Sequence, residues 1–172
     1  MAATTNWYEQ NGAATGSPAH GTESSISSCD WKNIDDSTTP RASSPVLAGA
    51  NSYTKYIYLR FAGTFNQVSA VKFAHTDGTL GTGISLKGKI TSEYNTPSTS
   101  AMSGGEDITD TTPIGSGESV LLSTTGPNGA NPSASQSSAC YTQYIATQVQ
   151  TTPSANAGDS GTVTLTLQYN EN

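Results

Sequence analysis

Residues 161–169 read GTVTLTLQY, and this stretch decides the fold class. Its apolar residues alternate strictly with polar ones: Val163, Leu165, Leu167 and Tyr169. A period of two places successive side chains on opposite faces of an extended chain, so one face packs on a core and the other is rich in threonine. The stretch therefore predicts a β-strand that covers a core on one side.

The most apolar part of the chain, residues 53–61 (YTKYIYLRF), has the same alternation. One face of this segment carries Tyr53, Ile57, Leu59 and Phe61, and the other carries Tyr56, Tyr58 and Arg60. Aromatic and β-branched residues favour a pleated, buried surface. We expect this segment to be a central strand.

Further segments are strand candidates, and turn-forming residues separate them. They are residues 26–31, 84–94, 118–122 and 141–150, a short piece near Trp7 and Tyr8, and residues 65–74, which are either a strand or an irregular crossing. In residues 141–150 the alternation places Tyr141 on the same face as Ile145. Because no window has a helical apolar period over three turns, the prediction is an all-β fold. We expect an antiparallel β-sandwich, jelly-roll or immunoglobulin-like, with long polar loops.

The length of 172 residues fits one domain. Three stretches are too long and too polar for tight turns: residues 11–25, 95–117 and 123–138. The sequence therefore predicts an extended N-terminal arm or loop over residues 1–25 and a single β-sandwich domain over residues 26–172.

Composition restricts the classes of function. There are 13 acidic and 7 basic residues, a net charge of −6, and the acidic residues are dispersed. Nucleic-acid binding calls for clustered Lys and Arg, so no nucleic-acid partner is expected. The apolar runs are far shorter than the roughly 20 residues of a membrane helix. The N-terminus lacks the basic and apolar regions of a secretory signal, so we expect no membrane span and no classical secretion.

Two cysteines, Cys29 and Cys140, lie far apart without metal-ligand spacing. They form either one bridge between distant strands or two free, buried thiols. Free thiols are favoured because nothing in the sequence indicates an oxidising compartment.

One short motif invites comparison with chymotrypsin-like serine proteases. Residues 158–161 spell GDSG, residues 73–75 spell FAH, and Asp107 or Asp110 would complete the order of a catalytic triad. However, the family's next glycine is a threonine here, and only 12 residues follow Ser160. We interpret GDSG as a turn before the last strand and predict that the protein is not an enzyme.

Metal and cofactor sites are not indicated either. His20 and His75 have no partner at metal-ligand spacing. The acidic residues form two loop clusters without the DxDxDG pattern of a calcium loop: Asp30, Asp35 and Asp36, and Glu106, Asp107 and Asp110. No phosphate-binding loop is present, so no cofactor is expected.

Three aromatic residues outside the strongest strands are candidate partner contacts: Trp7, Tyr8 and Trp31. Aromatic side chains of this kind anchor protein contacts or close the end of a sandwich. They also stack on sugar rings, which leaves a surface adhesin or carbohydrate-binding module as an alternative.

The chain resembles a family in two blocks, residues 52–73 (SYTKYIYLRFAGTFNQVSAVKF) and residues 151–172 (TTPSANAGDSGTVTLTLQYNEN), which are joined by Ser/Thr/Gly-rich loops. The pattern is similar to small β-sandwich virion structural proteins of tailed bacteriophages, of the capsid decoration or cement type. The resemblance covers the central block and the C-terminal part of the chain.

The resemblance implies a non-enzymatic protein, made in the host cytoplasm, that binds the capsid surface and stabilises the lattice of the major capsid protein. It implies a homo-oligomer, with a trimer favoured. The expected contacts are the N-terminal segment with Trp7 and Tyr8, and the loop of residues 95–117. A neck or tail component, which would bind other virion subunits, is the alternative within virions.

Overall fold

The computed structural model describes residues 2–108, 114, 120–156 and 161–172, and in that part of the chain it is built from antiparallel strands without an α-helix. The longer strands are β1 (Thr4–Thr15), β2 (His20–Ile26), β3 (Lys55–Ala62), β4 (Val68–Asp77), β5 (Ile84–Thr91), β10 (Tyr144–Thr151) and β11 (Thr164–Glu171). The short ones are β6 (Glu106–Asp107), β7 (Leu122–Ser123), β8 (Ser135–Gln136) and β9 (Cys140–Thr142), and one 3-10 turn, η1, spans Arg41–Ser43. The predicted all-β sandwich is confirmed.

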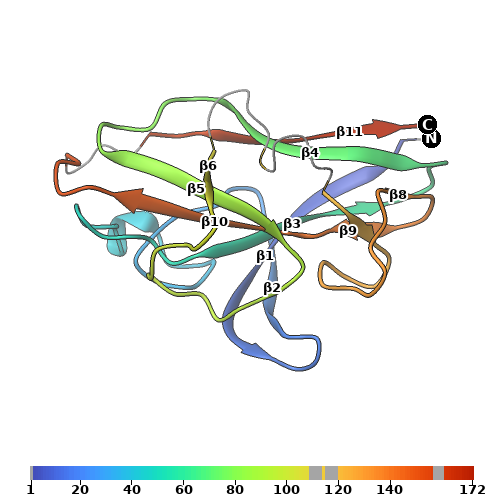
Figure 1. Cartoon of the computed structure of the whole chain (residues 1–172), viewed down its shortest axis with the longest axis horizontal. Helices are drawn as coiled ribbons and strands as arrows, with labels where there is room; N and C mark the ends of the chain where they lie inside the picture. Colours follow the sequence, from blue (N-terminus) through green and yellow to red (C-terminus); the bar gives the residue numbers. More distant parts are fainter. Residues whose placement is uncertain (1, 109–113, 115–119, 157–160) are drawn as a thin grey trace.

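The larger sheet has the order β2-β1-β3-β10-β5-β6, and β9 with β7 extends it beside β3. β3 pairs with β1 over seven residues, with β10 at Ile57, and with β9 at Phe61. It is therefore the central strand that its alternating sequence predicts. In Figure 1, β5 and β10 run across the middle of the molecule beside β3.

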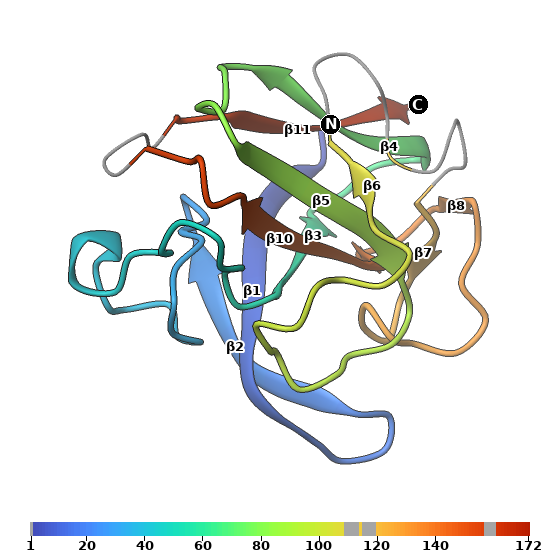
Figure 2. The ribbon, with the colours of Figure 1, turned by 60° about the vertical axis from the view of Figure 1, so that its left-hand side comes forward.

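The smaller sheet, β11-β4-β8, lies over one face of the larger one (Figures 1 and 2). The main apolar core fills the space between them. From β3 it takes Ile57, Leu59 and Phe61, and from β4 it takes Val68, Val71 and Phe73. The apolar side chains of β11 pack against this core, as the alternation in residues 161–169 predicts.

The opposite face of the larger sheet is also buried. Tyr56 and Tyr58 of β3 and Tyr144 of β10 form a second cluster there, together with Tyr94 and Ala146. Met102 packs on the same cluster, so the segment between β5 and β6, which contains Tyr94 and Met102, covers this face. Both faces of β3 are thus covered, one by a sheet and one by a connecting segment.

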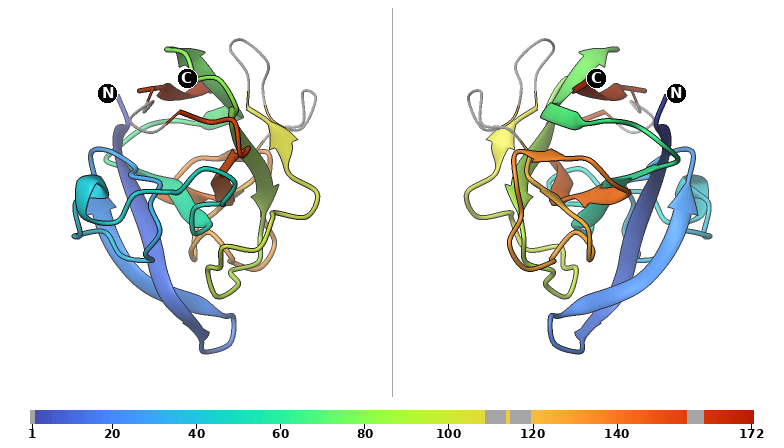
Figure 3. Two further views of the ribbon diagram at one scale, coloured as in Figure 1. Left: turned by 90° about the vertical axis from the view of Figure 1, so that its left-hand side faces the viewer. Right: turned by 90° about the vertical axis from the view of Figure 1, so that its right-hand side faces the viewer.

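The prediction of an arm or loop over residues 1–25 is wrong. β1 and β2 form a long antiparallel hairpin, and β1 belongs to the larger sheet through its pairing with β3. Figure 3 shows this hairpin projecting from the body of the molecule. The strand predicted near Trp7 and Tyr8 is real. It extends to Thr15 because β1 pairs with β3 as far as Gln10 and with β2 beyond it, and this pairing outweighs the weak strand propensity of its Gly and Ala residues.

Three further boundaries differ from expectation. The segment of residues 27–31 is not a strand, because β2 ends at Ile26. The predicted strand of residues 141–150 is interrupted at Gln143, so Tyr141 contacts Tyr58 in the tyrosine cluster while Ile145 faces the apolar core. Of the strand expected over residues 118–122, Glu118 lies outside the described residues and β7 begins only at Leu122.

Cys29 and Cys140 are free thiols, as expected. Burial raises the pKa of the Cys140 thiol to about 11, and it also raises the pKa of Cys29. Both therefore stay neutral near pH 7 and pack as small apolar groups. Among the described residues, no helix has the length and apolar character needed to cross a membrane.

Candidate functional site

A groove of about 420 Å³ lies between one edge of each sheet. One wall is the start of β11 with the residues before it, 161–165, and the other wall is the segment of residues 26–31 that follows β2. Trp7 and Ile57 line the groove from β1 and β3 of the larger sheet. We call this feature the edge groove. Its volume lies within the range of ordinary ligand pockets.

A second cavity of about 500 Å³ adjoins the edge groove, and the two share Trp31, Arg41, Gly161 and Val163. Its lining is largely apolar, with Val46 and Leu47 from the segment after η1, Ile84 and Leu86 from β5, and Val149 from β10. Leu47 is 65% exposed, an unusual state for a leucine beside an apolar cavity. The groove and the cavity together form one extended, largely apolar depression, which we call the apolar depression. It runs along the side of the sandwich where residues 26–31 face residues 161–165.

Of the three aromatic residues predicted as partner contacts, the structure brings two together in the edge groove. Trp7 is half-buried and packs edge-on against Phe73, with ring centroids 6.2 Å apart. Trp31 is also half-buried, and its indole Nε1 donates a hydrogen bond to Thr147 Oγ1 at 3.1 Å. Each indole is held in place by the protein and keeps part of its surface toward the groove.

Tyr8 does not join them. Successive residues of β1 point to opposite faces, so Tyr8 lies on the tyrosine side of the sheet and stacks on Tyr58 with a centroid distance of 5.6 Å. The Tyr58 hydroxyl donates to the Glu23 carboxylate of β2. Tyr8 is therefore part of the packing that holds the N-terminal hairpin.

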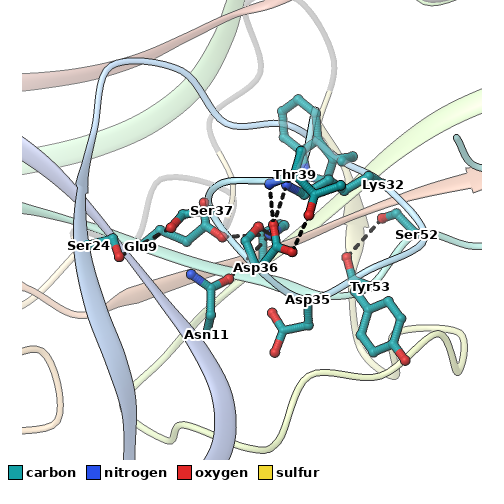
Figure 4. A network of polar contacts seen from close by, with 12 residues as sticks. Glu9, Asn11, Ser24, Lys32, Asp35, Asp36, Ser37, Thr39, Ser52 and Tyr53 are labelled. Carbon is teal, nitrogen blue, oxygen red and sulfur yellow. Dashed lines mark hydrogen bonds and ion pairs between the residues drawn. The ribbon is translucent and has the colours of Figure 1, made fainter. Parts of the chain in front are cut away.

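A buried ion pair joins Glu9 of β1 to Lys55 of β3, beside the loop of residues 32–39. Figure 4 labels Glu9 and the loop residues Asp36 and Thr39. Lys55 Nζ donates to Glu9 Oε1 at 2.6 Å, to Asn11 Oδ1 at 3.3 Å and to the Asp36 carbonyl at 3.0 Å. The Lys55 and Glu9 side chains are only 1% and 3% exposed. Burial raises the pKa of Glu9, while the Lys55 ammonium opposes that shift. The pair ties β1 and β3 to the loop of residues 32–39.

A second lysine closes the same loop. Lys32 Nζ donates to Asp36 Oδ1 at 2.8 Å and to the Thr39 carbonyl at 2.5 Å, and Thr39 donates to Asp36 from both its backbone N–H and its hydroxyl. The hydrogen bond from Lys32, assisted by those from Thr39, lowers the pKa of Asp36. The loop beside the groove wall is thus fixed by charge-assisted hydrogen bonds.

Asp35 occupies a different position. Its Oδ2 accepts from the Gly12 N–H at 2.6 Å, while Oδ1 is buried and has no hydrogen-bond partner among the described residues. Desolvation by burial raises the pKa of this carboxyl. The hydrogen bond from the Gly12 N–H and the nearby Lys55 ammonium oppose that shift.

The three carboxylates of the first acidic loop cluster have different roles in the structure. Asp30 is exposed on the groove, Asp36 binds Lys32, and Asp35 binds Gly12. In the second cluster Asp107 pairs with Lys87 at 2.8 Å, and Asp110 lies outside the described residues. Within the described part of the chain, no three His, Cys, Asp or Glu side chains gather as metal ligands would.

Only part of the protease-like elements lies in the described residues. Asp159 and Ser160 of the GDSG motif lie outside the described residues, and residue 75 of the FAH motif is in β4. His20 begins β2 in the projecting hairpin, where its ring Nδ1 lies 3.4 Å from the Gly21 carbonyl oxygen.

Sequence reasoning missed both buried lysines. For Lys55 a signal exists, since it occupies the same alternating face of β3 as Ile57 and Leu59, and Glu9 shares a face of β1 with Trp7. An inward lysine and an inward glutamate on paired strands predict an ion pair. For Lys32, which lies in a loop, no periodic pattern is available.

Comparison with known protein families, with curated proteins and with solved structures returns no match to this chain.

Proposed function

We propose that this protein is a non-enzymatic virion structural protein that decorates a capsid and stabilises the lattice of the major capsid protein. The observation that carries the proposal is the apolar depression along the open side of the sandwich, with the indoles of Trp7 and Trp31 in the edge groove and exposed Leu47 beside the adjoining cavity. Aromatic anchors in a partly desolvated site are typical of protein contacts.

The electrostatics of the chain support the same role. Three of its lysines form ion pairs within the protein: Lys32 and Lys55 do so while buried, and Lys87 pairs with Asp107. The net charge of −6 keeps the free protein soluble before it docks. A decoration protein needs those properties and needs no catalytic group.

The proposal includes a homo-oligomer, with a trimer favoured, in contact with major capsid subunits around a symmetry axis. Many identical weak contacts then add avidity. Light scattering on the purified chain should give the mass of three chains, and a monomer at the highest accessible concentration would contradict this part of the proposal.

Copy number tests the virion role. Quantitative mass spectrometry of purified particles from the culture that makes this protein should find hundreds of copies per particle. A few copies per particle would replace decoration by a neck or tail position, and absence from every particle fraction would overturn the virion role.

A carbohydrate-binding module is the second candidate, because two tryptophans in one groove are a common arrangement for stacking on sugars. Here Trp7 uses a ring edge on Phe73, and Trp31 is held by its bond to Thr147, so only part of each ring is available. A glycan array read with wild-type protein and with Trp31→Ala separates the two functions. Binding that is lost in the variant supports the sugar site, and no binding supports the protein contact.

A further inference from the structure

The edge groove follows the backbone of one strand edge. Its wall contains five consecutive residues, 161–165, which include both inward-facing Val163 and Leu165 and outward-facing Thr162 and Thr164. A cavity lying on one face of a strand would touch every second residue. Contact with consecutive residues places the cavity along the backbone edge of Thr164 and Leu165, which begin β11, and of the three residues before them.

That edge has no strand beside it among the described residues. The smaller sheet runs β11-β4-β8, so β11 pairs on one side only, with β4. On that side the end of β4 is close to the start of β11, because a side chain on Gly78 would collide with the Thr162 carbonyl. The other side of residues 161–165 faces the groove. An unpaired strand edge is a template for pairing with another chain.

The apolar core is incompletely covered along the edge groove. Ile57, Phe61 and Phe73 are at most 2% exposed, whereas Val163 and Leu165 remain half-exposed although they pack against the same core. Across the groove, Ile26 and Trp31 are half-exposed as well. An extended segment placed between the two sheet edges would cover all of these apolar surfaces.

Charge selects the kind of segment. Arg41 lies where the edge groove meets the adjoining cavity, is exposed, and has no carboxylate within ion-pair distance among the described residues. Asp30 lines the edge groove but not the adjoining cavity, so the junction of the two carries the Arg41 guanidinium. A guanidinium there suits a ligand with a carboxylate, which it can hold bidentately.

We propose that the edge groove binds an extended segment of a partner protein, which adds as a strand along residues 161–165, inserts alternate apolar side chains toward Trp7 and Trp31, and pairs an acidic residue with Arg41. Strand addition combines main-chain hydrogen bonds for affinity with side-chain pockets for specificity. This inference deepens the proposed function, because it names the docking surface and the chemistry of the capsid segment that occupies it.

The test is selection of random ten-residue peptides, displayed on filamentous phage, against the purified full-length chain. The expected winners alternate apolar residues and contain one Asp or Glu. As synthetic peptides they should protect the backbone amides of residues 161–165 from hydrogen exchange. Winners without this pattern, or peptides that protect only other segments, would overturn the inference.

Two variants and a control sharpen the test. Arg41→Glu should weaken the winning acidic peptides at least tenfold and shift a fresh selection toward peptides with Lys or Arg. Val163→Arg, which fills the groove, should abolish binding. Ile34→Lys changes an exposed apolar residue that lines neither cavity and should leave binding unchanged. Equal binding by the wild type and Arg41→Glu would contradict the proposed pairing.

The inference and the proposed function can fail separately. If the protein is absent from all particles and the peptides still depend on Arg41, the virion role fails and the groove remains a site for strand addition. If wild-type and Arg41→Glu proteins occupy particles equally and no peptide is selected, the decoration role stands and the groove inference fails.

Discussion

The two faces of the larger sheet are both buried, but by different chemistry. On one face Ile57, Leu59 and Phe61 pack against the smaller sheet. On the other face of the same strand, Tyr56 and Tyr58 pack with Tyr94 and Tyr144 beneath a connecting segment. The alternation of one strand thus builds two cores, one apolar and one made of phenol rings.

The tyrosine face differs from the apolar face because its hydroxyl groups form directional hydrogen bonds. Tyr144 donates to Gln10 Oε1 at 2.8 Å and Tyr94 donates to the Gly12 carbonyl at 2.7 Å, so both hold the N-terminal hairpin. Buried hydroxyls need such partners, whereas apolar side chains need only to be covered. The tyrosine face therefore holds neighbouring segments in place through its hydroxyl hydrogen bonds. The apolar face has no such bonds and is incompletely covered at the edge groove.

The largest effect is expected from breaking the buried ion pair between Glu9 and Lys55, which lies at the margin of the apolar face. Glu9→Gln leaves the Lys55 ammonium buried without a carboxylate, which should lower the free energy of unfolding by roughly 3–5 kcal/mol. Urea unfolding at pH 7 measures it. The double variant Glu9→Leu/Lys55→Met removes both charges and should recover most of the loss. A single variant as stable as the wild type would show that the pair is solvated.

The next effect concerns the apolar face itself. Leu59 is 3% exposed in the main core, so Leu59→Ala removes buried methyl groups and leaves a cavity. A loss of about 3 kcal/mol is expected by urea unfolding. Leu47→Ala, at a leucine that is largely exposed, is the matched control and should change stability by less than about 0.5 kcal/mol.

Alkaline pH should break the tyrosine face selectively. Burial raises the pKa of Tyr58, Tyr94 and Tyr144 above the ordinary value of about 10. In the unfolded chain these phenols lose their protons near that ordinary value, while the folded chain keeps them. The stability that they contribute is therefore complete below pH 10 and lost as the pH rises above it.

For three such groups the loss should reach roughly 3 kcal/mol by about pH 10.7. Phenolate absorbance and circular dichroism followed together measure it. These tyrosines should ionise only as the fold is lost. Complete ionisation of all eight tyrosines while the fold persists would contradict the buried cluster.

The smallest effect isolates one hydroxyl. Tyr144→Phe keeps the ring and removes the donor to Gln10, so the free energy of unfolding should fall by about 1 kcal/mol. Tyr141→Phe is the matched control, since its ring contacts remain and no hydrogen bond of its hydroxyl is seen among the described residues. Equal stability of the two variants would mean that the directional bond contributes nothing.

Alternation alone predicts the sandwich and both faces of β3, because period-two patterns are strong in residues 53–61 and 161–169. It fails for the N-terminal hairpin, where Gly, Ala and Ser give little propensity. There β1 is held by β3 as far as Gln10, and β1 and β2 pair with each other beyond it. It also fails for Tyr141, since the break at Gln143 inverts the face. Strand register and the gap between two sheet edges depend on contacts between distant segments, which a local sequence pattern does not encode. The groove could therefore not be predicted from the sequence.

Two of the three aromatic candidates lie in the edge groove and the third does not. Trp7 and Trp31 reach one groove from segments that are distant in sequence, while Tyr8, adjacent to Trp7, points to the opposite face. A periodicity of two separates neighbours in a strand, and only the assembled sheets bring Trp31 to Trp7. Arg41 lies in a 3-10 turn, and no sequence motif marks it as part of the site.

The most direct test of the account is a cryo-electron microscopy map of particles that carry this protein. The account predicts copies at regular lattice positions, with an extended segment of a neighbouring subunit lying along residues 161–165 between Trp7 and Trp31 and a carboxylate at Arg41. Regular copies whose edge groove is open to solvent, with contact made instead through the segment between β5 and β6, would contradict it.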